Sequence, residues 1–388
     1  MAFRRKYATT ALILLLVSAA FSSCVDAEPF AADTEQLAEH ISTALAATAA
    51  ENERATSATP TSDMPINPLT GMPVTDPSRL ERKPVFVKVS NHPPIGRPHA
   101  GLSFADIVFE YYIGSGQSRF MALFYGQDAN LIGPVRSGRR VDAEIVPMYG
   151  GILGYGSADA DTDAVIVNSL GQYAISNLEG PCPAFCGEET HSATGVFANS
   201  AAISEFVDMN GWENKAPDLP GMSFQDQAPE NMLPAEGLMI LFNYYNRGEW
   251  RYDADSGTYL RWIEEIENYG TLEESMQMIP LVDRITGDQL AFENIIVIFA
   301  LYDELAPSAH AIEIQKNNDG RPAYLFRDGG LIEGEWATPN DSDPIQFTTR
   351  DGEPMPLKPG STWIAIMGIN SSWEEVQPGQ WESFFSLP

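Results

Sequence analysis

Short stretches of β-branched and aromatic residues, separated by turn residues, recur from residue 84 to residue 367 and constrain the fold most strongly. Stretches of this kind form strands when Gly, Asn or Asp turns bound them. The first three clear cases are residues 84–89, 107–113 and 119–125. With 31 Gly and 28 Pro in 388 residues, an all-helical bundle is disfavoured. The pattern therefore predicts a strand-rich protein.

The two halves of the chain differ in pattern. Further short strands are predicted at 150–156 and 164–168, and helical spacing follows at 196–209. Beyond residue 232, strands alternate with Asp-Gly turns, and 264–278 is the one helical excursion that we expect. We predict an α+β protein. A mixed α/β domain at 67–215 is followed by a linker at 216–231, a mostly antiparallel β domain at 232–370 and a tail at 371–388.

The chain begins with a pattern typical of an export signal, predicted at residues 1–23. A basic segment, Arg4, Arg5 and Lys6, precedes an apolar stretch at 11–21. This stretch is too short to span a bilayer comfortably, because a spanning helix needs about 20 residues. It ends in Phe-Ser-Ser-Cys24, which resembles a bacterial lipobox with Phe where Leu is usual. We expect a lipid on Cys24. Cleavage after Ala27, which would release a secreted protein, is the alternative.

Residues 24–66 read as a flexible tether. Of the 41 residues at 26–66, 11 are Ala and 9 are Ser or Thr. A segment with so few large apolar side chains cannot bury enough apolar area to offset the entropy lost on ordering. A random coil of this length reaches about 35 Å. The expected location is the outer face of a bacterial cytoplasmic membrane, with the lipid anchor as the membrane contact.

Charge is distributed unevenly. The net charge of −30 argues against nucleic-acid binding, which needs a basic surface. Residues 79–140 nevertheless carry nine basic and four acidic side chains, a net charge of +5. Arginine forks suit phosphate and carboxylate groups. This arginine island predicts a pocket for an anionic ligand, and its core is Arg97, Arg119, Arg136, Arg139 and Arg140.

An internal role for the same arginines stays open. Arg97 and Arg136 could bridge Asp106 and Glu110 inside the protein, since buried pairs fix geometry at least as often as they bind ligands. Gly138 lies beside the arginines, and a residue without Cβ lets backbone and ligand approach closely. We expect one of Arg136 and Arg139 to be structural and the other to be open to solvent.

Cys182 and Cys186 remain once Cys24 is assigned to the anchor. An exported chain meets oxidising conditions, so a small disulfide loop is expected. A zinc site with His191 and the adjacent Glu188 and Glu189, or two free thiols, are the alternatives. We expect no metal and no cofactor.

Other acidic residues suggest weaker hypotheses. The series Asp159, Asp161, Asp163 has calcium-loop spacing but continues with Ala164 where Gly is needed and Leu170 where Glu is needed. A solvated turn is the simpler reading, with a loose calcium site as the alternative. The chain lacks Gly-x-Ser-x-Gly and His-Glu-x-x-His, so catalysis would rest on Asp106 and Glu110 as paired carboxylates, or on His191.

Several long motifs resemble those of the YerB-like lipoprotein family, whose two domains are of unknown function. The resemblance covers roughly residues 67–370 and implies a cell-envelope lipoprotein without implying a reaction. It departs from the family pattern around 159–163, at the Cys182–Cys186 loop and at 264–278. The motifs are Asn-Pro-Leu-Thr-Gly at 67–71, residues 97–110, Ser-Arg-Phe at 118–120, residues 132–139, Tyr-Leu-Phe-Arg-Asp-Gly at 324–329, Glu-Gly-Glu-Trp at 333–336 and Gly-Ser-Thr-Trp-Ile at 360–364.

The leading hypothesis is a non-catalytic binding protein tethered to the membrane, with an envelope polymer or another exported protein as partner. A wall-active hydrolase and a purely structural interaction protein are the alternatives. Trp336 and Trp363 are expected in the core because they lie within predicted strands, and Trp373 and Trp381 are expected as surface anchors.

Overall fold

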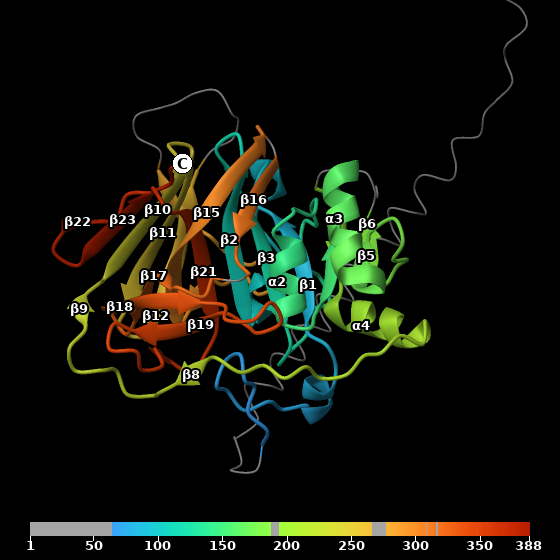
Figure 1. Cartoon of the computed structure of the whole chain (residues 1–388), viewed down its shortest axis with the longest axis horizontal. Helices are drawn as coiled ribbons and strands as arrows, with labels where there is room; N and C mark the ends of the chain where they lie inside the picture. Colours follow the sequence, from blue (N-terminus) through green and yellow to red (C-terminus); the bar gives the residue numbers. More distant parts are fainter. Residues whose placement is uncertain (1–63, 188–193, 266–276, 308, 316) are drawn as a thin grey trace, which may run out of the picture.

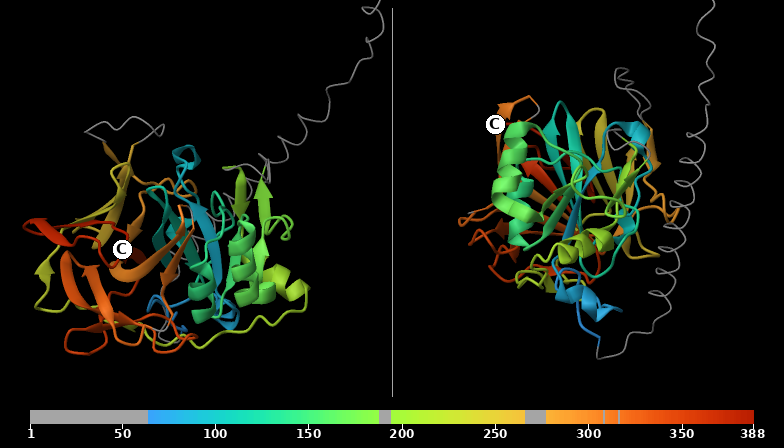
Figure 2. Two further views of the ribbon diagram at one scale, coloured as in Figure 1. Left: turned by 45° about the horizontal axis from the view of Figure 1, so that its top comes forward. Right: turned by 90° about the vertical axis from the view of Figure 1, so that its right-hand side faces the viewer.

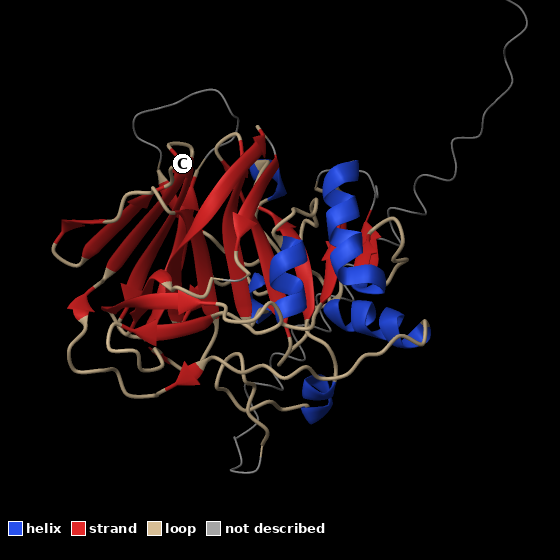
Figure 3. Ribbon diagram, viewed as in Figure 1, coloured by secondary structure: helices blue, strands red, loops and turns tan. Residues whose placement is uncertain are grey.

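The computed structural model describes residues 64–187, 194–265, 277–307, 309–315 and 317–388 (Figure 1). Strands make up 42% of the described residues and helices 14%, which agrees with the predicted strand-rich α+β class. The helices gather on one side of the molecule, beside the strands of the first half (Figure 3). They are α2 (Asp142–Met148), α3 (Ala160–Leu170) and α4 (Ser200–Met209). No described helix is long and apolar enough to cross a membrane.

A sheet of 12 strands contains segments from both halves of the sequence. Two short strands join it off the main path, β16 (Ala309–Glu313) on β15 and β9 (Leu233–Pro234) on β18. Its spatial order is β19 (Gln346–Thr349), β18 (Gly330–Ala337), β17 (Arg321–Arg327), β15 (Asn294–Ala306), β21 (Thr362–Gly368), β2 (Ile107–Gly114), β3 (Gln117–Phe124), β1 (Val85–Ser90), β4 (Ile152–Tyr155) and β5 (Ala174–Ser176).

The predicted α/β domain and the predicted β domain share one sheet, because β2 and β21 pair in parallel at its centre. Ile107 lies opposite Thr362 and Tyr111 opposite Ile366. β21 also pairs in parallel with β15, so the second half is not simply antiparallel. Both central strands are almost continuous apolar runs, which need a neighbour on each side and cover on both faces.

A second sheet of seven strands comes entirely from the second half of the chain and packs against the first (Figure 2). Trp250 of this sheet and Trp363 of the first sheet meet edge to face, 5.2 Å between ring centroids. Its order is β13 (Met278–Pro280), β12 (Thr258–Glu264), β11 (Asn246–Asp253), β10 (Gly237–Asn243), β23 (Gln380–Phe384) and β22 (Glu374–Gln377), with β14 (Ala291–Phe292) on β12.

Two small sheets complete the set, β6 (Phe185–Gly187) with β7 (Val196–Ala198) and β8 (Ser223–Phe224) with β20 (Pro356–Leu357). β8 lies within the predicted linker, which packs along the protein instead of hanging free. Leu219 is buried, and the Gln225 amide donates to the Leu357 carbonyl at 2.8 Å. The linker is thus part of the folded structure.

The strand predicted at 164–168 is wrong, because these residues belong to α3. The Asp159 carboxylate caps this helix by accepting from the Thr162 amide at 3.0 Å. Thr162, Ile166 and Leu170, spaced by four, form its buried face. The cap and this periodicity outweigh the β propensity of the valines. The helix predicted at 196–209 is found at 200–209, and most of the 264–278 excursion lies outside the described residues.

The predicted core tryptophans are confirmed, whereas the two that were expected as surface anchors pack against the core. Trp336 and Trp363 are fully buried in the core, together with Trp250. Trp373 and Trp381 are half-buried and stack at 5.5 Å, and Trp373 also stacks on Tyr324 at 4.1 Å. Through Trp373, this stack packs on aromatic rings of β15 and β17 of the large sheet.

Candidate functional site

Glu110 lies between the two sheets, where only 1% of it is exposed. Its Oε2 accepts from Arg261 Nη2 at 3.0 Å and from Trp363 Nε1 at 3.2 Å, while Oε1 accepts from Ser118 Oγ at 2.8 Å. Desolvation raises the pKa of Glu110, and the charge of Arg261 and the hydrogen bonds oppose that shift. Glu110 thus joins the two halves and has no solvent in front of it.

Arg97 and Arg119 also point inward. Arg97 Nη2 lies 2.7 Å from Glu264 Oε1, and Nη1 donates to the Glu264 carbonyl at 3.0 Å. Arg119 is 2% exposed, and its Nη1 donates to the His92 carbonyl at 3.0 Å. These two members of the arginine island hold the strand ends and the second sheet together. The expected partners were Asp106 and Glu110, but the carboxylate that Arg97 meets is Glu264.

A buried ion pair that sequence reasoning missed lies beside the island. Lys88 Nζ is 2.9 Å from Asp142 Oδ1, both side chains are fully buried, and the Tyr111 hydroxyl contacts both groups. Burial lowers the pKa of Lys88 to about 8, although the neighbouring Asp142 carboxylate opposes the shift. A lysine inside the apolar run Val-Phe-Val-Lys-Val was the available signal, because a lysine is rarely buried without a partner.

The remaining arginines lie on the segment from residue 136 to residue 140, called here the arginine loop. The Arg136 amide donates to the Lys88 carbonyl at 3.0 Å and the Gly156 amide donates to the Arg136 carbonyl at 2.9 Å. The loop is therefore fixed at the carboxyl ends of the parallel strands β1 and β4. Gly138 packs closely on α3, since a Cβ there would lie 2.6 Å from Ile166 Cδ1.

The arginine loop keeps its side chains partly open to solvent. Arg136, Arg139 and Arg140 are each half-buried. Among the described residues no carboxylate oxygen lies within 4.0 Å of the Arg139 or Arg140 guanidinium, and the one side-chain hydrogen bond of Arg139 goes to the Gly138 carbonyl at 3.0 Å. The nearby Asp142 is already used by Lys88 and by the Arg139 amide. Arg139 and Arg140 thus form no direct ion pair with a described carboxylate, although the charges of Asp142 and Asp159 act on Arg139.

Asp106 and Glu110 do not share a cleft. Asp106 precedes β2 and accepts from Asn67 Nδ2 at 2.8 Å and from the Tyr125 and Gly126 amides at 2.5 and 3.0 Å. It lines a cavity of about 360 Å³ from which Glu110 is absent. Burial raises the pKa of Asp106 to about 7 against these three donors. The pairing that the hydrolase hypothesis needs is therefore not formed.

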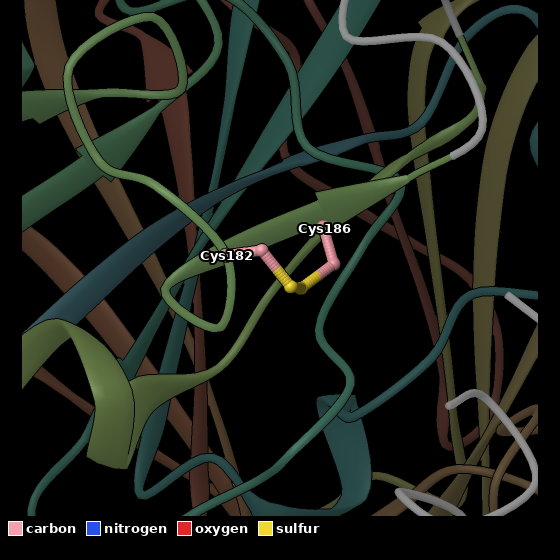
Figure 4. The surroundings of a disulfide bond; sticks show 2 residues. All are labelled: Cys182 and Cys186. Atoms are coloured by element: carbon pink, nitrogen blue, oxygen red, sulfur yellow. A yellow bond between two sulfur atoms is a disulfide. The ribbon is translucent and has the colours of Figure 1, made fainter. Parts of the chain in front are cut away.

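Cys182 and Cys186 are joined in a disulfide beside β6 (Figure 4). His191, Glu188 and Glu189, which would complete the zinc alternative, lie outside the described residues, as does Cys24. No group of three or more His, Cys, Asp or Glu in the described parts of the chain is arranged to hold a metal ion. Asp161 and Asp163 lie in the first turn of α3, where negative charge stabilises the helix.

Two domain families match the two halves of the chain in order. Residues 69–213 match the family described as "Protein of unknown function (DUF3048) N-terminal domain", and residues 239–364 match its C-terminal domain. The chain belongs to this YerB-like family. A relative named "Putative lipoprotein YerB", from Bacillus subtilis (strain 168), is 28% identical over 309 residues, covering 77% of this chain and 85% of the relative.

A crystal structure of the YerB protein from Bacillus subtilis has a similar fold. It aligns with a TM-score of 0.63 and 26% identity, covering 78% of this chain and 96% of that one. The name of the relative describes a putative lipoprotein and the family domains are of unknown function, which is consistent with the expected membrane-anchored, extracytoplasmic location.

Proposed function

We propose that this protein is a lipid-anchored, extracytoplasmic binding protein of the cell envelope, and that the arginine loop is its anion site. The observation that carries the proposal is the pair Arg139 and Arg140, whose guanidinium groups are half-buried and lie beyond 4.0 Å from every described carboxylate. A half-buried guanidinium binds an anion more strongly than an exposed one, because water screens it less.

The position of the loop supports the same proposal. In open sheets with parallel strands, ligands bind beyond the carboxyl ends of the strands. The arginine loop lies at that edge of β1 and β4, and Gly138 brings its backbone close to α3. Three arginines lie within five residues, and the planar guanidinium group matches the geometry of a phosphate or carboxylate group. Two guanidinium groups can donate hydrogen bonds to one such anion.

The tether supports the envelope as the place of action. Cys24 ends the predicted signal, and about 40 residues separate it from the first described residue. A lipid on Cys24 would hold the folded part within a few tens of ångströms of the membrane, among wall and membrane polymers that carry phosphate. A single acyl chain binds membranes only weakly, so two or more chains on this cysteine are expected.

The binding test is a calorimetric titration of the full chain with glycerol 3-phosphate, with acetate as a parallel carboxylate arm. Arg136→Gln and Arg139→Gln should lose at least tenfold in affinity for the anion that binds. Arg350→Gln is the matched control, because Arg350 is a 71% exposed arginine paired with Glu333 elsewhere on the surface. Unchanged affinity in both loop variants would refute the anion site.

A further inference from the structure

A second site follows from the cavity that Asp106 lines, called here the Asp106 pocket. Its volume of about 360 Å³ lies within the range of small-molecule sites, roughly 300–1,000 Å³. Its walls come from five parts of the chain: residues 67–79, 103–106, 126–128, 291–293 and 360–361. The pocket therefore forms only when the two halves are joined.

Hydrogen bonds fix the floor of the pocket. Asn67 holds one oxygen of Asp106, and the Tyr125 and Gly126 amides hold the other. On the opposite wall, the Ser361 amide donates to Glu293 Oε2 at 2.7 Å, while the next amide along the chain, Thr362, donates to the Asp106 carbonyl at 3.0 Å. Consecutive residues of one segment thus bind the Glu293 side chain on one flank and the Asp106 backbone on the other, and both residues line the pocket.

Gly360 makes this arrangement possible. It has a φ of +142°, and a Cβ at this position would lie 2.3 Å from the Glu293 carboxylate. Its amide donates to the Thr70 carbonyl at 2.8 Å, which ties the first described segment to the second half. Three of the motifs that mark the family resemblance, around residues 67–71, 97–110 and 360–364, therefore meet at this one cavity.

The charges in the pocket do not balance. Asp128 is paired with Arg82 at 2.7 Å and with Arg79 at 3.5 Å, so these groups satisfy one another. Asp106 and Glu293 have no basic nitrogen within 4.0 Å among the described residues, and Glu293 Oε1 accepts no hydrogen bond there. The pocket therefore offers two carboxylates to a ligand and no uncommitted cation to receive an acidic group.

The rest of the lining is suited to hydroxyl groups. Thr75, Ser103, Gln127 and Ser361 supply hydroxyl and amide groups, and Phe104 supplies an apolar wall. We propose that the Asp106 pocket binds an amino sugar, with its ammonium group between Asp106 and Glu293 and its hydroxyl groups on the Ser and Thr side chains. This site is separate from the arginine loop and does not depend on it.

The test compares glucosamine, N-acetylglucosamine and glucose by calorimetric titration of the full chain at pH 7, where most of the glucosamine is in the ammonium form. Glucosamine should bind at least tenfold more tightly than the two neutral sugars. Glu293→Gln keeps an oxygen for the Ser361 amide and removes the charge, so it should cost at least tenfold in glucosamine affinity. The control is Glu353→Gln, an exposed acid remote from the pocket lining.

A second variant does not touch the hydrogen-bonded floor. Thr75 is an exposed residue at the rim, and Thr75→Trp should block glucosamine binding with the melting temperature unchanged. Arg139→Gln should leave glucosamine binding intact, which separates this proposal from the anion site. Equal binding of the three sugars, no binding of glucosamine by the wild type, or full binding by Glu293→Gln would each overturn the proposal.

Discussion

The Glu110 carboxylate on β2 accepts a hydrogen bond from Arg261 Nη2 on β12 at 3.0 Å, and each side chain is at most 2% exposed. The two residues are 151 positions apart and belong to different sheets. The Arg261 guanidinium also lies over the rings of Trp250 and Trp363, at 4.7 and 5.1 Å from their centroids. This contact is a cross-link between the halves of the protein.

Removing either Glu110 or Arg261 alone should lower the free energy of unfolding strongly. Glu110→Leu leaves a buried guanidinium without its partner, and Arg261→Met leaves a buried carboxylate, so each variant should lose about 3–5 kcal/mol of unfolding free energy. The double variant should lose clearly less than the sum of the two losses. Urea unfolding of all four proteins measures the coupling. Additive losses would show that the two side chains do not act as a pair.

The buried histidine His99 should make the fold sensitive to acid. Desolvation, with the charge of Arg97, lowers the pKa of His99 to about 3 from 6.5. Between pH 6.5 and pH 3, His99 is therefore protonated in the unfolded chain and neutral in the folded chain. The contribution of His99 to the unfolding free energy is fully present above pH 6.5 and is lost as the pH falls toward 3. The wild type should lose unfolding free energy between pH 7.5 and pH 4.5, and in His99→Gln this loss should be smaller by about 3 kcal/mol.

Denaturant unfolding at the two pH values measures this difference for the wild type and His99→Gln. His92, whose pKa is also lowered to about 3 by burial, remains in both proteins and sets the residual slope. An identical pH dependence in the two proteins would contradict a neutral, buried His99.

The disulfide between Cys182 and Cys186 should contribute modestly. It closes a short loop, for which the loss of unfolded-state entropy corresponds to about 2 kcal/mol. The double change Cys182→Ala with Cys186→Ala should therefore lower the melting temperature by a few degrees and leave the fold intact. In the exported protein, mass spectrometry without reduction should find neither thiol alkylated. Two alkylated thiols would exclude the bond.

Lipid attachment is predicted at Cys24. Metabolic labelling with a palmitate analogue should mark the wild-type protein and spare Cys24→Ser, which should appear in the medium. A mature protein that begins at Glu28 would instead indicate cleavage after Ala27 and a secreted protein.

The individual strands were predictable because their residues are locally distinctive. Residues 84–89 and 107–113 were expected as strands, and β1 (Val85–Ser90) and β2 (Ile107–Gly114) confirm them within one residue. The insertion of β21 between β2 and β15 was not predictable. Pairing across about 250 residues depends on which apolar strands can bury both faces, and no local pattern records that choice.

The candidate residues show the same division. Arginines were recognised as a cluster, but only the fold separates Arg97, paired with Glu264, from Arg139, whose guanidinium forms no ion pair with a described carboxylate. Glu264 lies within the stretch that was expected to be helical, but it is the last residue of β12. Its ion pair with Arg97 could therefore not be inferred from the sequence. Lys88 was readable as an anomaly in an apolar strand, whereas Asp142 becomes its neighbour only when α2 packs on the sheet.

The most direct test of the arginine loop as an anion site is a melting experiment with and without glycerol 3-phosphate. A ligand that binds only the folded state stabilises it by about 2.7 kcal/mol at a concentration of 100 Kd. Wild type and Arg350→Gln should melt several degrees higher with the ligand. Arg139→Gln should melt at the wild-type temperature without ligand and show at most about half of that rise, because a tenfold weaker Kd leaves about 1.4 kcal/mol of stabilisation. An equal rise in all three proteins, or a large loss of stability in Arg139→Gln without ligand, would contradict a binding role for the loop.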